Sequence, residues 1–339
     1  MSRSVTLRDI AEALGVDMST VSRALNNSPR IRQSTAEKVR AKAAEMGYRP
    51  DPSLRRLTQL RWTGETSARP VSIALIKWLK ADCPFRTQEL IAPVRIAVES
   101  LGYGFETFCV EDYKSPAEAA RLMEARGVAG LILLPSNYPS AWTGFPWARF
   151  TAIHLLMGKE LPTGLSYVDQ GAFRVMLDAG RRVAEARPKS AAICFFSPPS
   201  ETPEGLQSYS AAVTVIEWWK KAGIACQPPR LFDGIEIMRQ MAEWLAKEKV
   251  EAAIVPNAGI DAWKKPNGQP ILPEKTKLIA LDRRGWSDFA GYERQSDLLA
   301  RRAVQYIDSL IRHGERGCPA LPETILVPLL WVPGPSFPE

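Results

Sequence analysis

The sequence has few of the features that mark membrane, secreted or metal-binding proteins. No apolar run approaches the ~20 residues that a membrane-spanning helix needs, and the first residues lack the apolar core of a signal peptide. The 5 cysteines are odd in number, widely spread and never in a Cys-x-x-Cys pair. This spacing excludes a zinc ribbon and gives no disulfide framework, so a cytoplasmic protein without a bound metal is expected.

Catalytic motifs are scarce as well. The sequence has no G-x-G-x-x-G after a predicted strand, no Walker loop and no G-x-S-x-G elbow, and neither His154 nor His313 lies near a nucleophile motif. Asp169 and Asp282 could be imagined as an acid–base pair, but solvated loop charges explain them more simply. The sequence therefore favours a protein that is not an enzyme and has no cofactor. An enzyme acting on a carbohydrate is the less favoured alternative.

The positive charge of the chain is concentrated at its N-terminus. Residues 1–61 contain 12 lysines and arginines against 6 acidic residues, whereas the rest of the 339-residue chain contains 32 against 31. A small nucleic-acid-binding head on a neutral body has this distribution. A solvated basic tail would give the same sum, so the helical pattern of the head has to decide between the two.

Three short helices are predicted in the head. The first follows Thr6 and ends at Gly15, and the second is capped by Asp17 and runs to Leu25. The third opens with a capping box at 34–37. Two helices across a tight turn, packed on a third, form a helix-turn-helix.

The second predicted helix has side chains suited to the major groove of DNA. Val21 and Leu25 face inward, which leaves Met18, Ser19, Ser22 and Arg23 facing outward near its N-terminus. The helix dipole and the free amides there favour nearby phosphates. A generic helical bundle with a solvated polar face is the alternative, but it does not explain the short turn together with the excess charge.

Residues 5–27 (VTLRDIAEALGVDMSTVSRALNN) and 35–50 (TAEKVRAKAAEMGYRP) resemble the DNA-binding head of the lactose-repressor (LacI/GalR) family of bacterial transcription regulators. The resemblance implies that Met18 and Ser19 set the choice of DNA sequence. The DNA-binding residues it implies in the head are Thr6, Met18, Ser19, Thr20, Ser22, Arg23, Asn26 and Tyr48.

A hinge helix is implied directly after the head. Asp51 can cap it and Pro52 suits its first position. By resemblance, Leu57 enters a minor-groove step and kinks the duplex, with Arg55 on the nearby backbone or groove edge. A flexible basic linker is the alternative, and both descriptions hold if DNA orders the segment.

From Val71 onward, short apolar runs alternate with helical stretches, which predicts parallel sheets flanked by helices. This order is similar to the family's effector domain, which is related to periplasmic sugar-binding proteins. The fold class is therefore α + α/β, with a ligand in the cleft between two lobes. The predicted segments are a head (1–50), a hinge helix and linker (51–69), and an effector and dimerisation domain (70–339) with lobe 1 at about 70–165 plus 296–322 and lobe 2 at about 166–295 plus 323–339.

The ligand-site residues are implied by resemblance and by the chemistry of sugar binding. Asp282 matches the family's effector-binding aspartate, and Asn257 and Asp169 are the next candidates. Gly205 stands where the family commonly has an arginine. Aromatic side chains can stack on sugar rings, although for any single tryptophan the sequence favours packing in the core or at an interface over contact with a ligand. The candidates, all in predicted loops, are Phe85, Trp142, Trp147, Trp263 and Trp286.

The sequence thus predicts a transcriptional regulator, a repressor in the first instance, whose affinity for a pseudo-palindromic operator is controlled by a sugar or sugar derivative. The alternative is a regulator that has lost its small effector and is controlled by a protein partner. Residues 328–339 are rich in proline and unlike the C-terminal leucine-repeat helix of the family's tetramers, so a homodimer associated with the nucleoid is expected.

Overall fold

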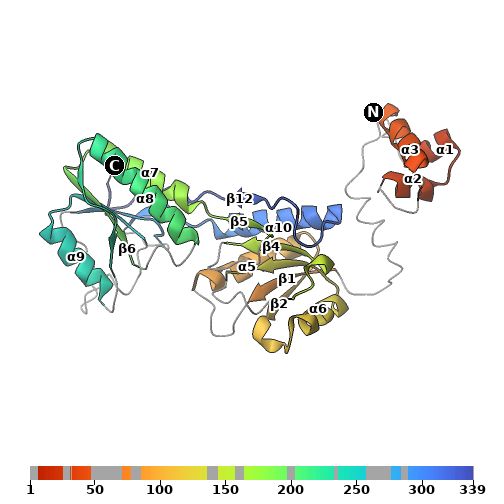
Figure 1. The fold of residues 1–339 in the computed structure, drawn as a ribbon, viewed down its shortest axis with the longest axis horizontal. Helices are drawn as coiled ribbons and strands as arrows, with labels where there is room; N and C mark the ends of the chain where they lie inside the picture. The colour runs from red at the N-terminus through yellow and green to blue at the C-terminus, as the bar shows by residue number, and fades with distance from the viewer. Residues whose placement is uncertain are drawn as a thin grey trace. The chain divides into compact units, whose positions relative to one another are not determined.

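A computed structural model gives the architecture of the chain. It describes residues 7–25, 31, 33–46, 71–77, 85–135, 144–156, 164–196, 203–232, 236–256, 276–283 and 289–338. The chain divides into two compact units, Met1–Ala68 and Arg69–Glu339, which are considered separately below (Figure 1).

The first unit is a three-helix head built from α1 (Leu7–Leu14), α2 (Met18–Leu25) and α3 (Gln33–Glu45). Gly15 ends α1 with a φ of +59°, and the amide of Val16 donates to the carbonyl of Ala11 at 3.1 Å. These contacts close the tight turn that the sequence predicts between α1 and α2. The small core that joins the three helices consists of Ile10, Ala11, Val21, Ala24, Ala36, Val39 and Ala43.

The start of the third helix differs from the expected capping box. Because α3 begins at Gln33, Ser34 lies inside its first turn rather than before it. The side chain of Gln33 donates to Glu37 at 3.3 Å instead.

The second unit contains two sheets, the first of which has six parallel strands in the order β12-β5-β4-β3-β1-β2. The strands are β1 (Ser72–Lys77), β2 (Gly104–Cys109), β3 (Val128–Leu133), β4 (Thr151–Leu155), β5 (Ser166–Asp169) and β12 (Thr324–Leu326). Along β1 the side chains alternate between the two faces. Ile73 and Leu75 pack with α5 (Phe85–Ser100) and α10 (Ser296–His313), whereas Ala74 and Ile76 pack with α6 (Pro116–Ala125). Both faces are therefore covered, as a parallel sheet requires.

The second sheet has seven strands, in the order β13-β11-β10-β9-β6-β7 with β8 paired to β6, and β13 is antiparallel to its neighbour. The strands are β6 (Ser190–Phe195), β7 (Ala225–Cys226), β8 (Arg230–Leu231), β9 (Ala252–Val255), β10 (Lys277–Ala280), β11 (Ala290–Glu293) and β13 (Leu330–Val332). Helices α7 (Ala172–Glu185) and α8 (Pro203–Lys221) cover one face, and α9 (Ile237–Lys247) covers the other (Figure 1).

Close contact between α7 and α8 depends on one glycine. A Cβ atom at Gly180 would lie only 2.4 Å from the side chain of Val215. The indole of Trp219, which is fully buried, donates to the carbonyl of Gly180 at 2.9 Å. The two helices thus pack backbone against side chain at this point.

The chain passes between the sheets three times, after β5, after β11 and after β12. Since β5 pairs with β4, and β12 pairs with β5, both strands belong to the first sheet. The predicted lobe boundaries at 165/166 and 322/323 put these strands into the second lobe and are wrong there. Strand β5 has four residues and β12 has three, and the chain crosses to the other sheet after each of them. The sequence pattern of such short strands does not show to which sheet they belong, so the assignment depends on strand pairing.

The proline-rich C-terminal segment is part of the second sheet. After β13, the hydroxyl of Ser336 donates to the carbonyl of Leu278 at 2.7 Å and accepts from the amide of Ala290 at 2.8 Å. Phe337 is 5% exposed and packs in the core beneath α7 and α8. The segment therefore stabilises the second lobe as an edge strand and its extension.

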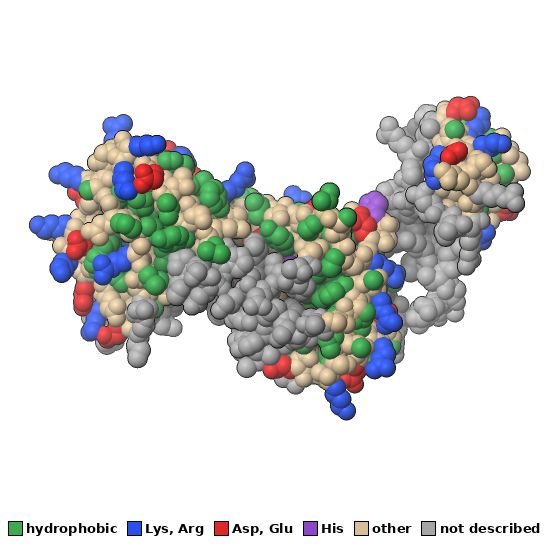
Figure 2. Space-filling view, in the orientation of Figure 1, with side chains coloured by type: hydrophobic (Ala, Val, Ile, Leu, Met, Phe, Trp, Pro, Cys, Tyr) green, Lys and Arg blue, Asp and Glu red, His purple; other side chains and the backbone are tan. Residues whose placement is uncertain are grey.

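Apolar side chains gather on the outer face of the second lobe, around α8 (Figure 2). Along this helix, three side chains at positions that share one face are between 38% and 51% exposed, namely Leu206, Tyr209 and Val213. Within the part of the chain that the structure describes, no helix is long and apolar enough to cross a membrane.

Candidate DNA-binding helix and ligand-site residues

The second helix of the head is positioned by its N-cap. The side chain of Asp17 accepts a hydrogen bond from the amide of Ser19 at 2.7 Å, and its carbonyl accepts from the amide of Thr20 at 2.9 Å. Hydrogen bonds from the hydroxyl and from the amide of Ser19 hold the pKa of Asp17 below its usual value, and Arg23 lowers it further. The predicted cap is confirmed, and it keeps the carboxylate charged beside the start of the helix.

Burial divides α2 into an inner and an outer side. Val21 is fully buried in the core of the head, whereas Met18 is 54% exposed. Ser19 and Arg23 are half-buried and lie one helical turn apart, so they share a side of the helix. Val21 and Met18 therefore lie as the sequence predicts, whereas Leu25, expected to face inward, is only partly buried, like Ser19 and Arg23.

The rest of the predicted DNA-binding set is described only in part. Thr20 is half-buried on α2, and Ser22 belongs to α2 by its backbone. The remaining members lie outside the described residues, namely Thr6, Asn26, Tyr48, Arg55 and Leu57. The DNA contacts of the whole set stay predictions.

Asp282, the first ligand-site candidate, follows β10 at the carboxyl edge of the second sheet. Its Oδ2 atom forms an ion pair with Nη2 of Arg294 at 2.9 Å, and the two side chains are 8% and 11% exposed. A second pair joins Nε of Arg283 to Oε2 of Glu293 at 3.5 Å. Both ion pairs connect the end of β10 to the end of β11. A backbone hydrogen bond joins the same two strand ends, from the amide of Arg283 to the carbonyl of Tyr292 at 2.9 Å.

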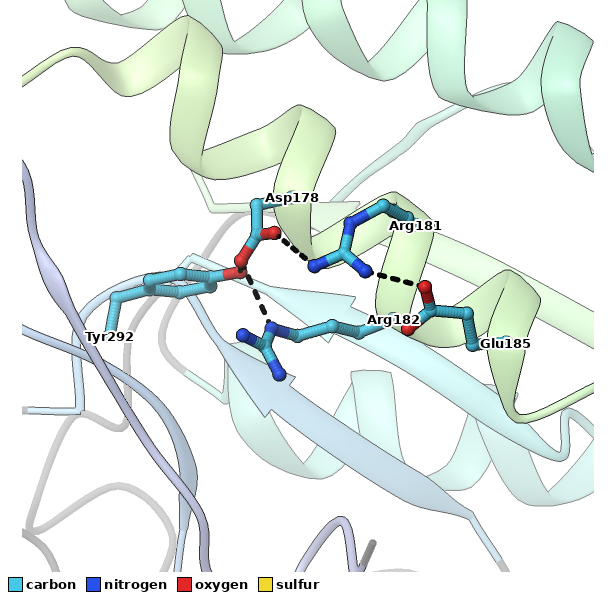
Figure 3. Close-up of polar contacts among 5 residues, drawn as sticks. All are labelled: Asp178, Arg181, Arg182, Glu185 and Tyr292. Carbon is cyan, nitrogen blue, oxygen red and sulfur yellow. Dashed lines mark hydrogen bonds and ion pairs between the residues drawn. The ribbon is translucent and has the colours of Figure 1, made fainter.

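Strand β11 is held in place by a polar network from α7 (Figure 3). The hydroxyl of Tyr292 donates to Asp178 at 2.6 Å, and Arg181 and Arg182 donate to the same carboxylate at 2.7 and 3.0 Å. Partial burial raises the pKa of Asp178, but these three hydrogen bonds outweigh it and leave the pKa below its usual value. The guanidinium of Arg182 also lies over the ring of Trp331 on β13, 4.0 Å from its centroid. The network therefore ties β11 and β13 to the helix beside them.

One further candidate lies at a strand end. Asp169 ends β5 in the first sheet, is 5% exposed, and accepts through its carbonyl from the amide of Val327 at 2.7 Å. Gly205 is in the first turn of α8. Asn257 lies outside the described residues, and so do three of the candidate stacking tryptophans, Trp142, Trp263 and Trp286.

The structure describes two of the candidate stacking residues. Phe85 is the first residue of α5 and not part of a loop. Trp147 lies in a short 3-10 helix (Trp147–Arg149) and packs on Phe145 with ring centroids 4.5 Å apart, so core packing accounts for it. Of the two adjacent tryptophans on α8, Trp219 is buried, whereas Trp218 is 43% exposed.

Sequence reasoning did not find Arg294. It lies 12 positions after Asp282 and belongs to no motif. The two residues meet because β10 and β11 are adjacent strands, and β11 itself has no alternating pattern that predicts a strand.

Comparison with known proteins gives the head its family. The family model described as "Bacterial regulatory proteins, lacI family" matches residues 6–51. The head belongs to the lacI family.

Relatives and solved structures extend the comparison beyond the lacI-family head. The HTH-type transcriptional regulator RafR of Escherichia coli is 33% identical over 132 residues, which cover 38% of this chain and only 37% of RafR. The lac repressor dimer bound to operator and the anti-inducer ONPF is 18% identical with a TM-score of 0.55, covering 99% of this chain and 100% of that one. The transcriptional regulator CelR in its cellobiose complex is also 18% identical with a TM-score of 0.55, covering 98% and 99%. At this identity the two structures establish the fold, which is the predicted α + α/β architecture with a two-lobed second unit.

Proposed function

We propose that this protein is a sequence-specific, DNA-binding transcriptional regulator, in the first instance a repressor. The observation that carries the proposal is the lacI-family head with a capped helix α2, which buries Val21 and exposes Met18, with Ser19 and Arg23 half-buried beside it. The N-terminal residues of a recognition helix in this motif contact base edges in the major groove. The basic charge of residues 1–61 supplies attraction to the phosphates.

The DNA partner in this proposal is a pseudo-palindromic operator, and the protein binds it as a homodimer in the bacterial cytoplasm. A single head covers too few bases to specify one site, and paired heads related by a twofold axis match a palindrome. Leu57 of the two hinge segments would enter the central minor-groove step. The similar fold of the lac repressor dimer bound to operator supports this assembly.

The second unit is proposed to bind a small molecule, a sugar or sugar derivative, which controls the affinity for the operator. The carboxyl edge of a parallel sheet is where such folds bind ligands, and Asp282 lies at that edge. The fold similarity to CelR in complex with cellobiose supports the class of ligand. The chain passes three times between the lobes, so the two lobes are linked by three segments. A ligand that binds more tightly to one arrangement of the lobes would shift the dimer between two states with different operator affinity.

A second candidate is a regulator of the same fold that is controlled by a protein partner. The exposed apolar side chains on α8, together with Gly205 in place of the family's arginine, favour it. Such a protein would bind its operator without responding to any small molecule.

The decisive experiment selects fragments of bacterial genomic DNA on the purified full chain at near-physiological salt and sequences them. A few enriched palindromes are the expected result, and the genes beside them indicate which sugars to test. Uniform recovery that vanishes as salt rises would mean phosphate binding alone, and the proposal would be wrong.

The first mutational prediction concerns Arg23. Arg23→Ala should weaken binding to the selected operator by about 1–3 kcal/mol and relax the sequence preference, because an arginine side chain forms two directed hydrogen bonds with a guanine. The measurement is a titration of the selected operator and of single-base variants. Arg121→Ala on α6, an exposed arginine outside the head, is the matched control and should leave the preference unchanged. An unaltered preference in Arg23→Ala would contradict its role in base recognition.

A further inference from the structure

The first residue of helix α2 has an exposed apolar side chain. Met18 is 54% exposed, and no other large apolar side chain in the described part of the head is exposed to this extent. It does not belong to the core that joins the three helices of the head. A single exposed apolar residue is common on protein surfaces, so the meaning of Met18 depends on what surrounds it.

The groups beside Met18 disfavour a DNA phosphate at this place. The carboxylate of Asp17 accepts a hydrogen bond from the amide of Ser19 at 2.7 Å, and the hydroxyl of Ser19 donates to the same carboxylate. A negative charge at the helix start repels a phosphate, and the hydroxyl hydrogen of Ser19 is already used. The start of α2 therefore offers a base pair the apolar side chain of Met18 and oxygen acceptors.

The base edges in the major groove differ in what such a surface can recognise. Thymine presents a C5 methyl group there, whereas guanine presents two acceptors that require a donor such as arginine. The thioether side chain of methionine is unbranched and flexible, so it can cover a methyl group in several conformations. Burying one methyl group corresponds to a change in affinity of about fourfold.

We infer that Met18 selects a thymine in each half-site of the operator by covering the C5 methyl group of that base. The inference rests on the proposed binding to an operator, and it names the chemical group that this side chain recognises.

The test removes single methyl groups from the DNA. In the selected operator, each thymine is replaced in turn by deoxyuridine, which pairs in the same way but lacks the C5 methyl group. The affinity of the full chain for each duplex is measured at one salt concentration, because phosphate contacts depend on salt. At one thymine of each half-site the replacement should weaken binding about fourfold, and replacement in both half-sites should weaken it about fifteenfold.

Variants of Met18 show whether this side chain recognises the methyl group. Met18→Gln keeps the length and the helix propensity of the side chain but loses its apolar end, so the thymine and deoxyuridine duplexes should bind equally. Met18→Leu stays apolar and should retain most of the difference. Leu122→Gln, at an exposed apolar residue of α6 outside the head, is the matched control and should retain all of it.

A second base pair provides an independent measurement. Cytosine and 5-methylcytosine differ by the same methyl group, so at the sensitive position the methylated duplex should bind the unmodified chain more tightly. Met18→Gln should bind the two duplexes equally.

Each contrary outcome has a defined meaning. If no thymine responds to loss of its methyl group, or if Met18→Gln keeps the full difference, the inference is wrong and selective operator binding still stands. If no operator can be selected at all, the proposed function is wrong and this inference fails with it.

Discussion

Asp178 is a residue whose charge state depends on neighbours from two separate elements. Tyr292, Arg181 and Arg182 all donate to its carboxylate. These bonds exist only in the folded chain, so its pKa is lower there than in the unfolded chain, despite partial burial. By linkage, the resulting stabilisation is fully present above the unfolded pKa of about 3.9 and is lost as the pH falls through the folded pKa.

This argument predicts the effect of pH on one variant. Asp178→Asn removes the charge but keeps the shape, so the free energy of unfolding should fall at pH 7, while the difference from the unmodified chain should shrink below about pH 4. Urea titrations at pH 7, 5 and 3.5 measure it. Glu217→Gln, at an exposed ion pair of α8, is the control with the same change of charge. A difference that stays constant across these pH values would contradict the assigned interactions.

Cysteine reactivity is a second property of single residues. Cys194 is fully buried in β6, and burial raises the pKa of its thiol to about 12. The thiolate is the reactive form, so Cys194 should resist alkylation at pH 8 in the folded chain and react after denaturation. Cys318 is exposed and should react in both states. Peptide mapping by mass spectrometry distinguishes them, and rapid modification of native Cys194 would show that β6 is not buried as described.

At the scale of elements, the contact between α7 and α8 decides how the second lobe packs. A Cβ added at Gly180 of α7 would lie 2.4 Å from the side chain of Val215 on α8. The sequence pattern predicts both helices but gives no sign that they approach so closely here, because a glycine inside a helix is also compatible with an exposed position.

The prediction at this scale is a pair of substitutions that rescue each other. Gly180→Ala should destabilise the chain by about 1–3 kcal/mol, because the added methyl overlaps Val215. In the Val215→Ala background the same change should cost much less, because the space for the methyl is then available. Chemical denaturation of the four proteins gives the coupling energy. Additive effects would mean that the two side chains do not meet.

At the scale of the whole molecule, the two units are expected to carry separate functions. The fragment Arg69–Glu339 contains both sheets and every helix that covers them within the described residues. It should therefore retain the secondary structure and the ligand response of the second unit and lose specific operator binding. Circular dichroism and operator titration test both points. Operator binding by the fragment would place base recognition outside the head.

Much of this architecture follows from the sequence itself. Periodic apolar residues and the cap at Asp17 predict α1, α2 and the turn between them, and short apolar runs predict β1, β3, β4, β6 and β9. These are local properties, in which spacing along the chain alone decides the structure. For the same reason the buried position of Val21 and the exposed position of Met18 on α2 are predictable from the pattern of apolar residues.

Tertiary structure decided what depends on partners far along the chain. Strands β5, β11 and β13 are short and lack a strong pattern, so their place in a sheet is decided by the neighbours with which they pair. The pair of Asp282 with Arg294 exists only because β10 and β11 lie side by side. Local spacing contains no information about such contacts, since their geometry arises from the packing of separate elements. The sequence by itself determined the helices of the head and the alternating core, and the folded chain decided which charges meet at the carboxyl edge of the second sheet.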